Sequence, residues 1–299
     1  MIIPALEGLT LSKGNAGGTD AIIVPDLDGH RDFGPDDIAL ICDRRSGIGA
    51  DALMRIVRIV GGTGETGWRI DAWDASGDPI DDPGPLVRLA AHYLRVSGLI
   101  LMEDGQTVDF ETAGGPRAAT RSGAGYAVAA ALALPASDEG LERGFDVAVT
   151  LDGVDGMMAG LTISSDRRSV VVAVEREEDL ASATGGVQYD PNPRAPGLVL
   201  VHPEGDTAFL DFDGVERPAT VFQLRAFERG IEKPAGDRWV RDAAIALATW
   251  AGESATGIYH AESGRHRTEV RLTGGEVEIT GTAEIVAEFM LTGLAGEGR

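Results

Sequence analysis

The sequence predicts an α+β protein made of two similar halves, each with strands wrapped around a central helix. Short strand-like runs bounded by Gly, Asp or Pro recur along most of the chain, and few helical patterns interrupt them. Two of the helical patterns follow a block of strands, open after a turn rich in Gly and Pro, and are rich in Ala and Leu. The expected strands are 21–24, 68–73, 108–111, 126–133, 147–151, 169–174, 198–201, 221–227, 268–272 and 277–280.

Three helices are expected, over 36–44, 86–97 and about 238–250. In the second, Leu86, Leu89 and Tyr93 recur at spacings of three and four, which places them on one helical face. The third helix has the same spacing of apolar residues, with Val240, Ala243 and Leu247 on one face. We expect it to be the central helix of the second half.

The boundary between the halves is expected in the polar stretch 135–144. The first half then covers 1–138, completed by a returning segment at about 282–295, and the second half covers 139–281.

Composition excludes several classes of protein. The chain has 299 residues, 43% of them hydrophobic and 25% charged, which is typical of a globular protein with a full core. Its formal charge of −22 argues against nucleic acid and anionic membrane as partners. Residues 1–14 lack the basic and apolar segments of a secretory signal, and no apolar run approaches the roughly 18 residues of a membrane span. We therefore expect a cytoplasmic protein.

The chain has one cysteine, Cys42, which excludes an internal disulfide and a multi-cysteine metal site. The five histidines show no metal-ligand spacing, so no metal is expected. Apolar neighbours within a predicted helix indicate that Cys42 is a buried hydrophobic residue rather than a nucleophile.

The segment 42–51, Cys-Asp-Arg-Arg-Ser-Gly-Ile-Gly-Ala-Asp, resembles the signature of the diaminopimelate epimerases of actinobacterial type. The resemblance continues in order along nearly the whole chain, which implies the fold of that family. Its further segments are 13–26, 68–71, 74–77, 87–88, 91–95, 97–99, 227–230, 274–277 and 285–287.

The resemblance implies a particular chemistry. These epimerases invert an α-carbon without a cofactor: one cysteine thiolate removes the proton, and a thiol on the opposite face returns one. Each cysteine precedes a helix in a Gly-rich turn whose N–H groups bind the substrate carboxylate. Members of the family are commonly dimers, so a homodimer is expected, with a small amino-acid-like ligand.

This chain departs from the pattern at both thiol positions. Pro83 falls at the first, and Pro85 deletes a second N–H group from the same turn. Asp237 falls at the second, and Arg238 and Trp239 follow it where small residues are expected. The sequence therefore predicts that both nucleophiles and both anion-binding turns are altered.

Positions that resemble the family's substrate-binding residues have also changed. Its asparagines fall at Thr19, at Asp74 and, less clearly, at Thr207, and its Gly-Asn-Pro-His segment falls at 166–169. A carboxylate in place of a neutral amide changes both the charge and the available hydrogen-bond donors.

Glu228 and Arg229 match the family residues that hold the substrate's amino and carboxylate groups. Arg229 can still bind a carboxylate through two hydrogen bonds. The alternative is that the pair is kept as an ion pair that braces the domain interface.

Two hypotheses on function follow. In the first, the protein has lost two-thiol chemistry and is a non-catalytic or repurposed paralogue. In the second, it is an isomerase, racemase or cyclase that uses Asp82 or Asp237 as the proton-transfer group, since burial can tune a carboxylate toward neutral pKa. An aspartate before a helix is, however, also an ordinary N-cap. Ordinary diaminopimelate epimerase activity is a third possibility, against which the altered residues argue.

Overall fold

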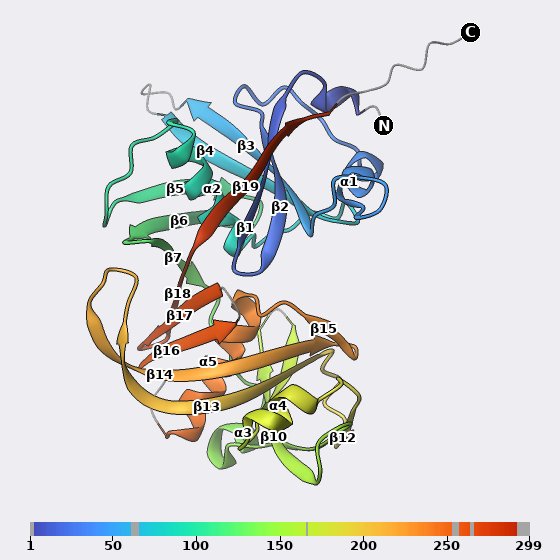
Figure 1. Cartoon of the computed structure of the whole chain (residues 1–299), viewed down its shortest axis with the longest axis vertical. Coiled ribbons are helices and arrows are strands. Elements are labelled where there is room, and N and C mark those ends of the chain that lie inside the picture. The colour runs from blue at the N-terminus through green and yellow to red at the C-terminus, as the bar shows by residue number, and fades with distance from the viewer. Residues whose placement is uncertain (1–2, 61–65, 166, 253–256, 264–265, 292–299) are drawn as a thin grey trace. The chain divides into compact units, whose positions relative to one another are not determined.

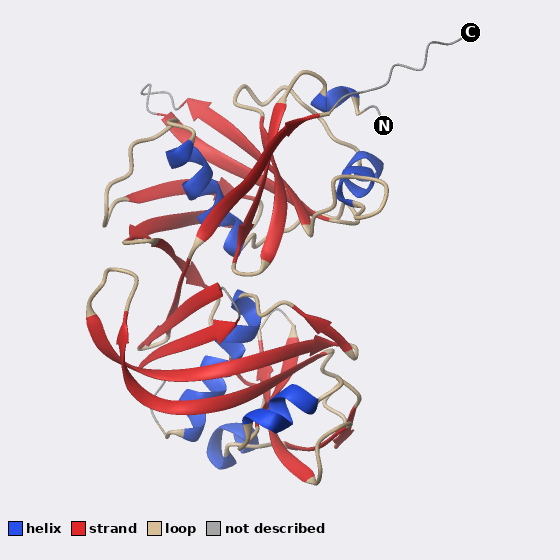
Figure 2. Cartoon of the chain, viewed as in Figure 1, coloured by secondary structure: helices blue, strands red, loops and turns tan. Residues whose placement is uncertain are grey.

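The computed structural model of the chain describes residues 3–60, 66–165, 167–252, 257–263 and 266–291, and it mixes helices with strands as the sequence predicts (Figures 1 and 2). The chain divides into two compact units. Unit 1 runs to Val128 and resumes at Thr282, and unit 2 is Ala129–Gly281. In the described part of the chain, no helix combines the length and the apolar composition needed to cross a membrane.

The elements up to the end of unit 1's first segment are η1 (Pro4–Leu6), β1 (Thr10–Ala16), β2 (Thr19–Pro25), α1 (Pro35–Cys42), β3 (Ala52–Val60), β4 (Thr66–Asp74), α2 (Pro85–Val96), β5 (Thr107–Thr112), β6 (Gly115–Ser122) and β7 (Gly125–Ala130). They are followed by β8 (Leu134–Pro135), α3 (Asp138–Arg143), β9 (Val147–Leu151), β10 (Met157–Ser164), β11 (Arg168–Ala173), α4 (Glu177–Ser182), β12 (Val187–Asp190), β13 (Gly197–Leu210), β14 (Glu216–Glu228), β15 (Ile231–Lys233), α5 (Asp237–Trp250), β16 (Gly257–Ser263), β17 (His266–Thr273), β18 (Glu276–Gly281) and β19 (Ala283–Met290).

The strands of unit 1 pair in the order β19-β1-β2-β3-β4-β5-β6-β7. The β2–β3 and β4–β5 pairs are parallel, and the others are antiparallel. The last strand of the chain therefore returns to unit 1, where residues 283–290 pair with β1.

The strands of unit 2 pair in the order β9-β10-β11-β13-β14-β16-β17-β18. Here the β11–β13 and β14–β16 pairs are parallel, and the others are antiparallel. The sequence of parallel and antiparallel pairings is thus the same in both units, with α2 and α5 at corresponding places in the chain.

The apolar face of α2 supplies much of the core of unit 1. Leu89, Ala90 and Leu94 are fully buried and pack with residues of the surrounding strands. Strand β1 approaches this helix closely at Gly14, where a Cβ atom would lie 2.6 Å from the Leu89 side chain. Burying each leucine is worth about 2 kcal/mol, so this face fixes the helix against the sheet.

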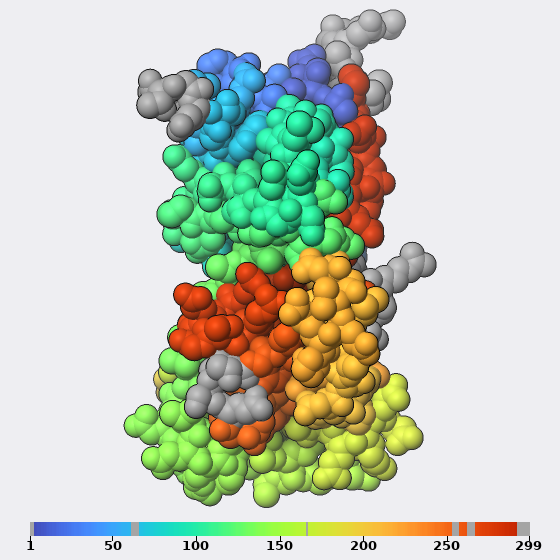
Figure 3. Space-filling model, turned by 90° about the vertical axis from the view of Figure 1, so that its left-hand side faces the viewer, coloured from blue at the N-terminus to red at the C-terminus, as the bar shows by residue number. Residues whose placement is uncertain are grey.

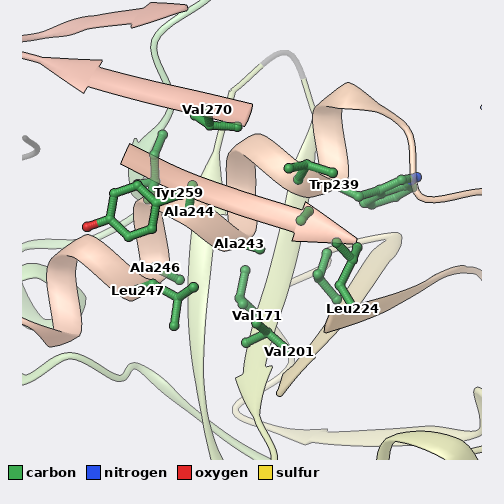
Figure 4. Packing of buried hydrophobic residues seen from close by; sticks show 14 of the residues in the cluster. Val171, Val201, Leu224, Trp239, Ala243, Ala244, Ala246, Leu247, Tyr259 and Val270 are labelled. Atoms are coloured by element: carbon green, nitrogen blue, oxygen red, sulfur yellow. The ribbon is translucent and has the colours of Figure 1, made fainter. Parts of the chain in front are cut away.

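Helix α5 has the same role in unit 2. Its side chains Ala243, Ala244 and Leu247 pack with residues from β11, β13, β14, β16 and β17 (Figure 4). The helices expected over 86–97 and about 238–250 are both present, displaced by no more than one residue at either end.

Three helical features differ from the expectation. The helix expected over 36–44 ends at Cys42, because the Asp43 carboxylate accepts hydrogen bonds from the amides of Arg45 and Ser46 and closes a turn. Helix α4 was not foreseen. Helix α3 occupies the stretch expected to be a boundary, and the Ser137 hydroxyl caps it by accepting a hydrogen bond from the Gly140 amide. In the chain, unit 1 gives way to unit 2 after Val128.

The β13–β14 hairpin extends alongside β16 to β18, as the gold and orange-red residues of unit 2 show (Figure 3). His260 on β16 is fully buried, and its ring stacks on Phe209 of the hairpin at 3.7 Å between centroids. Burial, together with the nearby Arg267 charge, lowers the pKa of His260 to about 4. The hairpin is therefore anchored by a histidine that is neutral in the folded protein.

We predict that unfolding becomes easier as the pH falls from 6.5 to 4. The unfolded chain, with an ordinary histidine pKa, binds a proton in this range that folded His260 does not, so up to about 3 kcal/mol of stability is lost. Urea unfolding at several pH values measures this loss. A His260→Phe variant keeps the ring stack, and its stability relative to the wild type should rise as the pH falls. A pH-independent difference would contradict the prediction.

Candidate functional site

The signature segment 42–51 lies within an ion-pair network of unit 1. The Arg44 guanidinium binds Asp20 at 2.7 Å and Asp51 at 2.8 Å, and the Lys13 ammonium lies 3.0 Å from Asp20. Although burial raises the pKa of Asp20, its hydrogen bonds with Arg44, Asp51 and Lys13 hold that pKa well below the usual range. The network ties β1 and β2 to the loop after α1, so the signature is structural.

Cys42 ends α1 inside an apolar cluster with Ile38, Ile41 and Ala50. Burial, followed by the negative charges of Asp20 and Asp51, raises the pKa of its thiol to about 12. The prediction that Cys42 is a buried hydrophobic residue is confirmed.

The turn before α2 uses its amide groups internally. Pro83 and Pro85 have no N–H group, and the Gly84 amide donates a hydrogen bond to the Asp82 carboxylate at 3.4 Å. The next two amides of the helix donate to the carbonyl oxygens of Pro83 and Gly84, at 2.8 and 3.1 Å. These amides at the start of α2 therefore donate within the turn itself.

Asp82 projects from this turn into solvent. Its side chain is 46% exposed and forms an ion pair with Arg117 at 3.2 Å. The Asp82 carboxylate is thus in contact with solvent and with a basic side chain.

Asp74 and Thr19, the two other unit 1 candidates, occupy turns. The Asp74 carboxylate accepts hydrogen bonds from the Ser76 amide at 2.9 Å, the Ser76 hydroxyl at 2.6 Å and the Asp78 amide at 3.1 Å. Burial raises its pKa, but these hydrogen bonds outweigh burial and lower it. Thr19 begins β2 after a two-residue Gly-Gly turn, opposite Ala16. Asp74 thus closes a turn through its Oδ1 atom, which accepts all three hydrogen bonds.

Asp237 is the first residue of α5 and is 8% exposed. It follows the N-cap Gly236, whose carbonyl accepts hydrogen bonds from the amides of Trp239 and Val240 at 2.9 and 3.2 Å. Of the two candidate catalytic carboxylates, this is the buried one.

Trp239 is buried and fills space beside β13. A Cβ atom at Gly197 would lie 2.6 Å from its ring, so only glycine fits there. The Arg238 guanidinium stacks over the same ring at 4.2 Å from the centroid. These bulky residues stand where the resembled family has small ones.

Glu228 lies at the end of β14 and pairs with arginines other than Arg229. Its Oε1 atom lies 3.3 Å from the Arg167 guanidinium and 3.6 Å from that of Arg238. The Arg229 side chain is exposed and, within the residues that the structure describes, makes no hydrogen bond or ion pair, while its amide donates to the Pro196 carbonyl. The two residues therefore do not form an ion pair with each other.

Sequence reasoning missed a buried polar network one turn into α5. The Asp242 carboxylate is fully buried and accepts hydrogen bonds from the Ser169 hydroxyl at 2.5 Å and from Arg241 Nε at 3.1 Å. Burial raises its pKa, and the Arg241 charge opposes the shift. The sequence did contain a signal for this network: Arg241 and Asp242 stand between Val240 and a run of alanines in the predicted helix.

The described residues contain no group of His, Cys, Asp and Glu placed to hold a metal ion. Three pockets of about 340, 520 and 430 Å³ lie in unit 2 around α3 and the end of α5. Neither Glu228, Arg229 nor Asp237 lines any of them. Of the other candidates in unit 2, Thr207 lies on the exposed part of the β13–β14 hairpin, and Asp166 lies outside the described residues.

No protein-family model matches the chain. Among curated proteins, the diaminopimelate epimerase of Corynebacterium glutamicum is 37% identical over 113 residues, which span 36% of this chain and 40% of that protein. The diaminopimelate epimerase of Thermobifida fusca is 28% identical over 304 residues, covering 94% of this chain and 97% of that protein.

Solved structures share the fold at low sequence identity. A phenazine biosynthesis protein of the PhzF family from Bacillus anthracis has a TM-score of 0.63 and 15% identity, over 95% of this chain and 99% of that one. A hydroxyproline epimerase from Agrobacterium vitis, with trans-4-hydroxy-L-proline bound, has a TM-score of 0.50 and 14% identity, over 94% and 91%.

We predict that Cys42 reacts with a disulfide reagent such as Ellman's reagent only after unfolding. Burial and the raised pKa leave almost no accessible thiolate at pH 8. The absorbance of the released thiolate, followed with and without urea, measures the reaction. One equivalent released rapidly from the folded protein would contradict the prediction.

We predict that Gly197→Ala destabilises the protein by about 1–3 kcal/mol, because the added methyl group overlaps the Trp239 ring. Urea unfolding measures the loss, and adding Trp239→Leu to the same chain should reduce the penalty of the alanine. Gly67→Ala is the matched control, since its nearest neighbour would be 3.9 Å away. Equal effects of the two alanines would disprove the overlap.

Proposed function

We propose, from the premise that this chain is a divergent member of the diaminopimelate epimerase family, that it has lost two-thiol epimerisation and is a non-catalytic or repurposed paralogue. The curated relatives named diaminopimelate epimerase support the premise. The sole cysteine, Cys42, is buried in a structural cluster and serves neither thiol position.

The observation that carries the proposal is that the Gly84, Leu86 and Val87 amides at the start of α2 donate within the turn. Two-thiol chemistry needs a thiolate and, beside it, N–H groups that stabilise the substrate carboxylate and the charge of the transition state. Here two residues of the turn have no N–H group, and the remaining amides donate within the segment from Asp82 to Gly84. Replacing the thiol alone would therefore not restore the site.

We infer that the two units are structural repeats with α2 and α5 as their central helices, which the shared order of strand pairings supports. The start of α5 is then the counterpart of the start of α2. There Asp237 is buried, Trp239 fills space, and Arg238 approaches Glu228. Both counterparts have departed from the epimerase pattern.

The second candidate function is a cofactor-independent isomerase that uses a carboxylate on an amino-acid-like substrate. The burial of Asp237 favours it, since this carboxylate is held out of bulk solvent at the start of α5, and a positioned carboxylate can transfer a proton. Asp82, exposed and paired with Arg117, favours it less. With either function, we propose that the protein is a cytoplasmic homodimer and a paralogue of a lysine-biosynthesis enzyme that does not itself act in that pathway.

We predict no α-deuterium uptake when the protein is incubated with LL- or meso-diaminopimelate in deuterated water, because neither thiol nor anion-binding turn is available. Mass spectrometry of the recovered amino acid measures the uptake, with the Thermobifida fusca enzyme as the positive control. Rapid uptake would refute the proposal. Uptake on proline or hydroxyproline that is lost in Asp237→Asn and kept in Asp82→Asn would favour the carboxylate isomerase instead.

We predict that a Pro83→Cys/Asp237→Cys double variant also stays inactive toward diaminopimelate, because Pro85 and the internally bonded amides remain. The same exchange assay measures it, after circular dichroism has verified folding. Recovery of exchange would show that only the thiols were missing.

A further inference from the structure

The cavity of about 340 Å³ in unit 2 lies at the last turns of α5. Its floor is formed by the buried side chains of Ile245, Ala248 and Leu272. Because an α-helix rises 1.5 Å per residue, the cavity lies roughly 15 Å along α5 from Asp237. It is therefore separate from the helix start, where the candidate carboxylate stands.

The rim of the cavity exposes three leucines. Leu132, Leu134 and Leu141 are 43%, 54% and 61% exposed, and all three border this one cavity. Apolar side chains that gather around a hollow gain free energy when a ligand removes them from water. The cavity therefore suits a ligand with an apolar body.

The polar side chains of the cavity are hydrogen-bond acceptors. The Thr249 hydroxyl donates to the Ile245 carbonyl at 2.8 Å, so toward a ligand it presents its oxygen. Glu276 adds a carboxylate that has no hydrogen bond or ion pair within the part of the chain that the structure describes. Among the described residues that line the cavity there is no lysine, arginine or histidine. The cavity thus offers acceptors and a negative charge.

The end of the helix adds to this preference. Helix α5 ends at Trp250, so Thr249 lies in its last turn, and Gly252 lines the cavity just beyond it. The C-terminal end of a helix carries partial negative charge, which favours a nearby cation. The formal charge of −22 on the whole chain acts in the same direction. Charge complementarity therefore selects a cationic head group.

We propose that this cavity binds a small amphiphilic amine. The hydrocarbon body of the ligand lies against the leucines, and its protonated amino group lies at Glu276 and Thr249. An ammonium group has three N–H donors and no acceptor, which matches a site whose polar side chains are acceptors. The cavity has the volume of a small-molecule site. The inference goes beyond the proposed function and does not depend on it.

Isothermal titration calorimetry of the full chain at neutral pH and constant ionic strength tests the proposal. The probes are hexylamine and octylamine, which are protonated at this pH, with octanol and octanoate as the neutral and anionic analogues. We expect one saturable site for octylamine and weaker binding of octanol and octanoate. Hexylamine should bind about fifteenfold more weakly than octylamine, since each buried methylene contributes about fourfold.

Two pairs of variants locate the site. Glu276→Gln should weaken octylamine binding by roughly threefold and leave octanol binding unchanged, because it removes only a charge. Glu278→Gln, further along β18, changes the net charge equally without lining the cavity, so octylamine affinity should change by less than about 1.5-fold. Leu141→Ala should weaken the binding of both ligands by roughly threefold. Leu210→Ala, at a leucine of similar exposure on β13, should change neither. Circular dichroism verifies that each variant is folded.

Three results would overturn the inference: no saturable binding of octylamine, binding of octanol or octanoate as tight as that of octylamine, or equal effects of the matched variants. Saturable octylamine binding that Glu276→Gln and Leu141→Ala weaken, and that their matched variants do not, would support it. The deuterium exchange assay tests the loss of two-thiol epimerisation separately, so either conclusion can fail without the other.

Discussion

Burial of one helical face in each unit is the interaction on which the rest of the structure depends. The apolar sides of α2 and α5 pack against the surrounding strands, and the strands cannot bury their inner faces without them. Because this packing fixes each helix along its whole length, it also fixes where the helix begins. The residues just before α2 and α5 are therefore held in defined positions whatever chemistry they carry.

Under the proposed function, those helix starts are where the chemistry changes while the fold persists. Proline at the first position of a helix removes only a donor that the helix does not use, so Pro85 is compatible with α2 even though it is unfavourable for anion binding. Trp239 likewise adds apolar contacts to the core of unit 2 at a place where a small residue would leave room for a ligand. Stability and binding impose separate demands on the same few residues.

The two units also differ in how their charged side chains pair. In unit 1, the positive charges of Arg44 and Lys13 balance the negative charges of Asp20 and Asp51, so the ion pairs around the signature segment are neutral as a group. In unit 2, Glu228 lies close to two arginines, Arg167 and Arg238.

The sequence by itself determined the class of fold and the extent of helices α2 and α5, since the spacing of residues such as Leu86 and Leu89 reports directly on which face is buried. It also predicts that Pro83 and Asp237 stand at the two thiol positions of the resembled family. It did not foresee α3, a six-residue helix too short for its periodicity to be recognised. Only the tertiary structure decided that Glu228 pairs with Arg167 and Arg238 rather than with Arg229, because those contacts join segments far apart in the chain and depend on how the strands bring them together.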